Sequence, residues 1–140
     1  MENNKFFIKN IKFTDMNFSQ TKNFTDVKNI KIDFGVASGY FVDKKNNLLQ
    51  LDLQLKIELF NGNNHDIAWL LESKLSSIVE YKNKFESDDL RQLLNILYLY
   101  SKPIIKQMAC IANVPIFNLP ELDFNNKNIK LINMNDKIDK

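Results

Sequence analysis

Residues 87–124 read SDDLRQLLNILYLYSKPIIKQMACIANVPIFNLPELDF, and this stretch decides the fold. Ser87, followed by two aspartates, predicts a helix start, because a hydroxyl caps the first amides and carboxylates favour the positive end of a helix. Mostly apolar residues then recur at helical spacing, and we expect them to cover one face of a sheet. This predicted stripe consists of Leu90, Leu93, Leu94, Leu97, Ser101, Ile104, Met108 and Ile111.

The helix also carries apolar side chains off that stripe, which predicts an oligomer interface formed by Ile96, Leu99, Tyr100 and Ile105. Pro103 predicts a kink, since proline removes a backbone donor and clashes with the preceding turn. Val114 precedes Pro115, so we expect the helix to end by Asn113. The segment after the helix is also rich in large apolar residues, which predicts that it either lines a groove or packs on its own domain.

The residues before the helix alternate with the period of strands. Residues 49–59 place apolar side chains on one face and polar side chains on the other, which predicts a half-buried strand of an antiparallel sheet. Residues 6–13, 30–42 and 67–81 predict further strands. Gly35 and Gly39 lie inside the second of these, where glycine marks a bulge or a close backbone approach.

Residues 14–29 are polar and too long for a hairpin connection, so we expect a crossover between strands that are not neighbours. Its large apolar residues, Phe18 and Phe24, either pin this connection to the body or contact a partner. Residues 125–140 form a tail whose pattern fits a short helix, a strand or a partly disordered end. We therefore expect a single domain at residues 1–124 followed by this tail.

Composition excludes some classes of function. The net charge is +2 and the charges alternate in sign along the chain, whereas nucleic-acid binding requires clustered cations. No window predicts a signal peptide or a membrane span. We therefore expect a cytoplasmic protein in which the lone Cys110 is a buried, reduced side chain.

No catalytic, cofactor-binding or metal-binding constellation is visible in the sequence. His65 is the only histidine, and it lies in a turn without partners at ligand spacing. The pair Asp88–Asp89 fits helix-cap chemistry, and Glu121 and Asp123 fit a solvated loop. We therefore expect a binding protein that uses no cofactor and no metal, rather than an enzyme.

Three segments resemble, in order, the SecB family of protein-export chaperones: KNIKF at residues 9–13, IKIDF at residues 30–34, and NILYLYSKPIIKQMACIANVPIFNLPELDF at residues 95–124. The resemblance spans residues 5–124. It implies an α+β fold in which one long helix packs on one face of a four-stranded antiparallel sheet with an early crossover. It also implies a homotetramer, a dimer of dimers, that holds unfolded clients in apolar grooves without ATP.

The resemblance further implies that the linker after the helix lines such a groove. Together with the two crossover phenylalanines, the expected client-binding residues are Ile116, Phe117, Leu119, Leu122, Phe124, Phe18 and Phe24. Of the acidic positions that the family presents to the SecA motor, only Glu72 keeps its charge, because Asn10 and Thr14 occupy the others. The expected contact with SecA therefore rests on Glu72. The family's aromatic–Pro–Tyr–Ala–Arg–Glu pattern is also replaced, at residues 98–103, and its glycine at the helix end is Ala112.

Several functions fit these patterns. A SecB-like holdase serves either general protein export or one dedicated client, such as an antitoxin. A small-ligand-binding or thioesterase-like α+β domain, with a cavity between helix and sheet, is an alternative of another class. An interaction subunit with one fixed partner is a third. The quaternary structure separates them, because it determines which apolar surface stays open to water.

Overall fold

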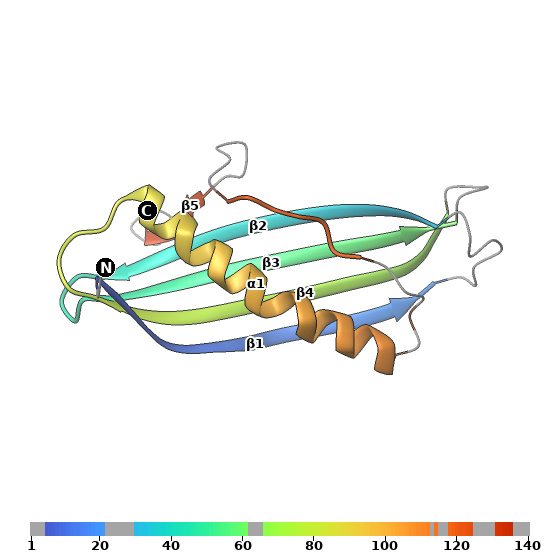
Figure 1. Cartoon of the computed structure of the whole chain (residues 1–140), viewed down its shortest axis with the longest axis horizontal. Helices are drawn as coiled ribbons and strands as arrows, with labels where there is room; N and C mark the ends of the chain where they lie inside the picture. The colour runs from blue at the N-terminus through green and yellow to red at the C-terminus, as the bar shows by residue number, and fades with distance from the viewer. Residues whose placement is uncertain are drawn as a thin grey trace.

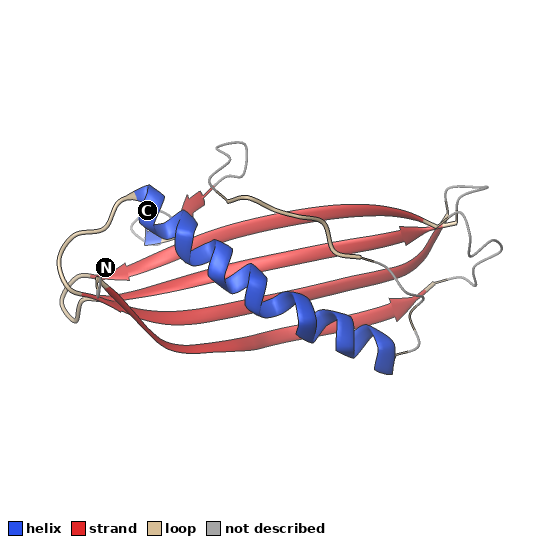
Figure 2. Cartoon of the chain, viewed as in Figure 1, coloured by secondary structure: helices blue, strands red, loops and turns tan. Residues whose placement is uncertain are grey.

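The computed structural model describes residues 5–21, 30–61, 66–112, 114, 118–124 and 131–135. In this part of the chain, five strands form one mixed sheet, and a long helix lies across one face of it (Figures 1 and 2). The elements are β1 (Phe6–Gln20), β2 (Lys31–Asp43), β3 (Leu48–Phe60), β4 (Ile67–Tyr81), α1 (Ser87–Ile111) and β5 (Leu131–Asn133). The α+β class and the position of the helix agree with the sequence-based expectation.

The strand order is β1-β4-β3-β2-β5. β1 therefore pairs with β4 rather than with β2, which confirms the predicted crossover. The first four strands are antiparallel to their neighbours, whereas β5 runs parallel to β2 opposite Ser38, Gly39 and Tyr40. The predicted four-stranded antiparallel sheet is thus extended by a short parallel strand from the tail, whose structure the sequence pattern left undecided.

β1 is longer than predicted, because it continues to Gln20 where a connection was expected from residue 14. Its pairing with β4 shifts register between Ile8 and Asn10 and again between Phe13 and Asp15. Each bulge inserts a residue and interrupts the alternation of faces. The inward side chains consequently follow irregular spacing, which hides the strand in the sequence: Ile8, Ile11, Phe13, Met16 and Phe18.

β2 pairs with β3 without a register shift, so the bulge predicted at its glycines is wrong. The close approach, the other expectation, is confirmed at Gly39. A Cβ added there would lie 3.2 Å from Met134 Cγ and 3.3 Å from the Ile132 carbonyl. The Asn135 side chain then bonds to both the amide and the carbonyl of Val42, at 2.7 and 3.1 Å. β5 therefore docks on β2 where the missing side chain leaves room for it.

The core lies between the sheet and α1. The apolar face of β3 is buried as predicted: Leu49, Leu51, Leu53, Leu55, Ile57 and Leu59. α1 crosses the strands diagonally over β3 and β4 (Figure 1). The predicted helix stripe is correct through Ser101 and wrong beyond it, because burial continues at Ile105 and Ala109. Steps of four residues exceed one helical turn, so the buried face rotates as the helix crosses the sheet.

α1 begins at Ser87, and its N-cap is Glu86 rather than the predicted Ser87. Asp89 Oδ2 accepts hydrogen bonds from the Glu86 amide at 2.9 Å and from Lys5 Nζ at 2.7 Å. Burial raises the pKa of Asp89, but the Lys5 and Glu86 hydrogen bonds and the Lys5 charge outweigh it, so the pKa lies below its ordinary value. The helix runs unbroken through Pro103 and ends at Ile111. The predicted end is therefore confirmed, and the bend at Pro103 stays a prediction.

Candidate functional site

Residues 118–124, the exit segment, lie along one side of α1 (Figure 2), and polar side chains of the helix hold their main chain there. Arg91 Nη1 donates to the Phe124 carbonyl at 2.8 Å, and Asn95 Oδ1 accepts from the Phe124 amide at 2.9 Å. Tyr98 Oη, one turn further along, donates to the Pro120 carbonyl at 2.5 Å. We call Arg91, Asn95 and Tyr98 the clamp. Because all of these bonds reach main-chain atoms, the helix sets the course of the exit segment.

Tyr98 is the central residue of the clamp. It is only 2% exposed, and its ring meets Phe34 of β2 and Phe124 edge-to-face, with centroid distances of 6.2 and 6.0 Å. Burial, and to a smaller extent the negative charge of Glu121, raises the pKa of Tyr98 to about 12. The hydroxyl is therefore protonated at neutral pH and available to donate to Pro120.

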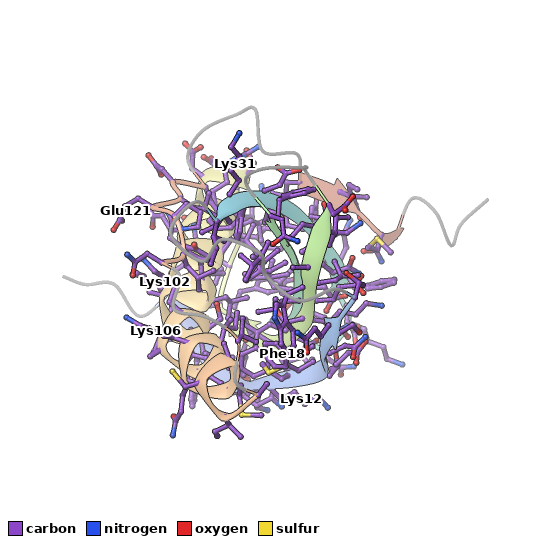
Figure 3. All side chains as sticks on the ribbon, turned by 90° about the vertical axis from the view of Figure 1, so that its right-hand side faces the viewer. Lys12, Phe18, Lys31, Lys102, Lys106 and Glu121 are labelled. Carbon is purple, nitrogen blue, oxygen red and sulfur yellow. The ribbon has the colours of Figure 1, made fainter. Side chains whose placement is uncertain are left out.

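A groove of about 330 Å³ opens between the second half of α1 and the exit segment. Pro103 and Leu119 give it apolar surface. Lys102 and Lys106, on successive turns of the helix, lie on the same side of the molecule as Glu121 (Figure 3). The residues that line the groove are Lys102, Pro103, Lys106, Asn118, Leu119 and Glu121. A surface of this mixed character suits an extended peptide, which offers both apolar side chains and polar main-chain groups.

The structure distributes the predicted client-binding residues over different environments. Leu119 and Leu122 are half-buried, and Leu119 also lines the groove. Phe124 is 0% exposed and belongs to the core, so it anchors the exit segment and offers no surface to a client. Phe18 is a half-buried residue of β1 rather than of a loop. The other predicted residues, Ile116, Phe117 and Phe24, lie outside the described part of the chain.

α1 carries exposed apolar residues away from the core. Of the predicted interface residues, Ile96, Leu99 and Tyr100 are 47%, 64% and 44% exposed. Ile105 requires a correction, because it is 2% exposed and packs in the core of its own chain. Met108 and Ile111, which were predicted to be core residues, are instead exposed, because the buried face of the helix rotates beyond Ser101. The outer helix surface, as we name it, consists of Ile96, Leu99, Tyr100, Met108 and Ile111.

β1 forms a long edge of the sheet. Among the described residues it pairs only with β4, so the other side of its 15-residue backbone has no strand partner there. Such an edge is a template for pairing with another chain. The inward side chains of its first half are only partly buried: Phe6, Ile8, Ile11 and Phe13. The edge is thus a second surface, besides the outer helix surface, that carries accessible apolar and main-chain groups.

The outer sheet face, opposite α1, carries Glu72, which is exposed and lies across from Lys56 of β3. Asn10 and Thr14, at the positions where the resemblance led us to expect acidic residues, lie at the bulges of β1. Their side chains bond to main-chain atoms of β4, at 3.1 and 3.5 Å. They therefore complete the irregular pairing of β1, and the face around Glu72 is mixed in charge rather than acidic.

The described residues carry few groups of the kind that catalysis or metal binding requires. In the described ranges, no cluster of three or more His, Cys, Asp or Glu residues is placed to hold a metal ion. No helix among those ranges has the length and apolar character to cross a membrane. Cys110 is exposed, so the prediction that it is buried is wrong. His65 lies outside the described residues.

The sequence-based reasoning missed the clamp, although the sequence contains a signal for it. Arg91, Asn95, Tyr98 and Lys102 recur at intervals of four, three and four residues, which places them on one flank of the helix beside the buried stripe. Lys102 Nζ lies 5.5 Å from the centre of the Tyr98 ring and 3.8 Å from Glu121 Oε1. Polar side chains at this spacing, followed by an apolar segment with prolines, indicate a helix flank that binds the chain returning beside it.

Comparisons with known proteins bear on the fold. No protein-family model matches the chain, and no curated protein sequence matches it. Its structure is similar to that of Mycobacterium tuberculosis Rv1957, a SecB-like chaperone solved in complex with a ChAD peptide from the Rv1956 HigA1 antitoxin. The TM-score is 0.73 at 10% identity, over 84% of this chain and 91% of that chain. A protein of unknown function from Streptococcus agalactiae aligns with a TM-score of 0.49 at 13% identity, over 83% and 97% of the two chains. The fold is SecB-like.

Proposed function

We propose that this protein is an ATP-independent chaperone, a holdase that binds unfolded polypeptides in the groove beside α1. The observation that carries the proposal is the exit segment, whose main chain is fixed by the clamp while Leu119 lines a groove open to solvent. Capture by apolar contact requires no nucleotide and no catalytic group. The similarity of its fold to that of a SecB-like chaperone solved with a bound peptide supports the same use here.

We propose that the chain assembles as a homotetramer, a dimer of dimers. The exposed apolar residues of the outer helix surface support this assembly, since contiguous exposed apolar surface ordinarily marks an interaction site. The long edge of β1 supports it too, because pairing with a second copy removes an aggregation-prone edge. We expect a tetramer by light scattering, with dissociation on Leu99→Asp. A monomer at micromolar concentration would contradict the proposed assembly.

We propose a cytoplasmic chaperone with one main client, such as an antitoxin, rather than a general export factor. Export requires docking to SecA, which relies on complementary charge, and the outer sheet face is mixed in charge around Glu72. The antitoxin peptide in the complex of the structural neighbour supports the dedicated use. Binding to the cognate SecA decides between the two. Micromolar or tighter affinity that is lost on Glu72→Lys would favour export.

The alternative of a ligand-binding or thioesterase-like domain requires a cavity between the helix and the sheet. The space beside Ile105, between α1 and strands β1, β3 and β4, amounts to about 10 Å³. Small-molecule sites typically measure about 300–1,000 Å³. This space between helix and sheet is therefore too small for a ligand, which disfavours this alternative.

The test is suppression of aggregation without nucleotide. Light scattering follows a chemically unfolded protein after dilution, with and without this chain. We expect the wild type to suppress aggregation, and Leu119→Asp to weaken capture about tenfold, because a carboxylate on the apolar wall loses hydration when a client binds. Phe117→Asp is expected to act in the same direction.

The matched control is Leu70→Asp, which makes the same change at a half-buried leucine of β4 on the outer sheet face. It should leave capture unchanged, and circular dichroism verifies that each variant keeps its fold. Full suppression by Leu119→Asp would show that the exit segment only packs on its own domain. A wild type that does not delay aggregation at any ratio would refute the holdase itself.

A further inference from the structure

We infer that the groove selects client segments in which an acidic residue stands beside a bulky apolar one. The inference deepens the proposed function and rests on it, since it specifies the class of segment that the groove holds. It is based on the charges at the rim of the groove, which are unequal. Lys102 and Lys106 contribute two cations, against the single carboxylate of Glu121.

These cations are available to a ligand. Lys106 is exposed and forms no ion pair with the described residues. Lys102, whose side chain is 25% exposed, lies 3.8 Å from Glu121, whose side chain is 98% exposed. Because the Glu121 carboxylate is almost fully in solvent, the carboxylate of a client can take its place beside Lys102. An incoming basic residue, by contrast, meets two ammonium groups.

The groove also has apolar lining beside the charged groups. Pro103 follows Lys102 on the helix, and Leu119 lines the same groove from the exit segment. A client segment can therefore seat an apolar side chain against these two residues while a neighbouring carboxylate reaches Lys106. Asn118, exposed at the same groove, offers amide groups to the main chain of the segment.

Part of the outer helix surface lies away from the groove. At 3.6 residues per turn, Lys102 and Lys106 project from the flank of α1 opposite to Tyr100 and Ile111, whereas Leu99, three residues before Lys102, lies next to the groove. Figure 3 shows Lys102, Lys106 and Glu121 together on one side of the molecule and Lys12 apart from them. Association of a second copy through Tyr100 and Ile111 therefore leaves the groove open to a client.

The test uses the assembled wild-type protein and fluorescent peptides of equal length. In each, a leucine stands beside aspartate, asparagine or lysine, and anisotropy reports binding. We expect the aspartate peptide to bind about two- to fivefold more tightly than the asparagine peptide at low salt, as one exposed ion pair provides. The lysine peptide should bind most weakly. Added salt should reduce these differences, because it screens exposed charges.

Two variants locate the effect. Lys106→Glu should reverse the order of aspartate and lysine peptides, whereas Lys44→Glu, the same change at an exposed position of the turn between β2 and β3, should preserve it. An order unchanged by Lys106→Glu, or altered equally by Lys44→Glu, would overturn the inference. If the peptides bind equally while the wild type still suppresses aggregation, the inference fails and the holdase stands. If the wild type also fails to suppress aggregation, the proposed function fails with it.

Discussion

Replacing Tyr98 by phenylalanine removes one atom from the clamp and leaves the ring in place. The hydrogen bond lost is that from Tyr98 Oη to the Pro120 carbonyl, at 2.5 Å. A bond of this kind contributes about 1 kcal/mol net, since the unfolded chain makes equivalent bonds to water. The edge-to-face contacts with Phe34 and Phe124 need no hydroxyl and persist. We therefore expect Tyr98→Phe to lower the free energy of unfolding by about 1 kcal/mol at pH 8.

Alkaline pH gives a second and more diagnostic readout of the same residue. Burial, with the charge of Glu121, raises the pKa of Tyr98 from 10.0 to about 12. The pKa of Tyr98 is higher in the folded chain than in the unfolded chain, so the buried hydroxyl stabilises the fold fully below pH 10. This stabilisation is lost as the pH rises toward 12, because the unfolded chain releases its proton first. Near pH 11.5 the wild type should have lost about 2 kcal/mol by this route. Tyr98→Phe should lose nothing by it.

Urea unfolding followed by circular dichroism measures both effects, at one protein concentration because the chain is proposed to associate. Tyr100→Phe is the control, since it deletes the same atom from a tyrosine that is 44% exposed on the outer helix surface. Stability that falls equally with pH in the wild type and in Tyr98→Phe would refute the assignment of the buried hydroxyl. A loss as large in Tyr100→Phe as in Tyr98→Phe would refute the clamp.

Two further predictions concern elements that hold the ends of the fold together. Gly39→Ala should lower stability by about 1 kcal/mol in thermal melts, because its methyl group crowds Met134 and displaces β5. Gly35→Ala, whose Cβ would lie 3.9 Å from its nearest neighbours, should be neutral or stabilising, and equal effects at the two glycines would contradict the docking of β5. Asp89→Asn should cost about 1 kcal/mol at pH 7, because it removes the ion pair with Lys5. The pKa of Asp89 is depressed, so this difference is fully present above its ordinary value of 3.8 and should shrink as the pH falls below that value, through the folded pKa. Urea unfolding measures this loss of stability at each pH. A loss in Asp89→Asn that does not change with pH, or the same pH dependence in the exposed Asp88→Asn, would contradict the role of the ion pair between Lys5 and Asp89.

Local patterns predicted the parts of the fold that rest on regular periodicity. The alternation along β3 identified both its buried and its exposed face, since no register shift interrupts it between Leu49 and Leu59. The polar stretch after the first strand signalled a crossover, which the strand order confirms. The helix and its end were predictable from an apolar repeat and from the restriction that proline places on the residue before it.

The parts that were mispredicted depend on contacts between distant segments. The bulges of β1 shift side chains from one face to the other, and no local rule places them. The diagonal crossing of α1 brings Ile105 into the core and leaves Met108 and Ile111 outside it. β5 forms because Gly39 leaves space for it, and Gly39 is distant in sequence from that strand. At the candidate site, the sequence identified the exit segment and missed the clamp, because polar residues on a helix are ordinarily solvated.

The clamp grips main-chain atoms of the exit segment at Pro120 and Phe124 and makes no demand on the side chains between them. Replacement of Glu121, whose side chain is 98% exposed, leaves these main-chain bonds in place, whereas Arg91, Asn95 and Tyr98 are constrained together by the segment that they hold. Under the proposed function, such a division would let an exposed side chain at the groove change with the client while the helix keeps its hold on the main chain.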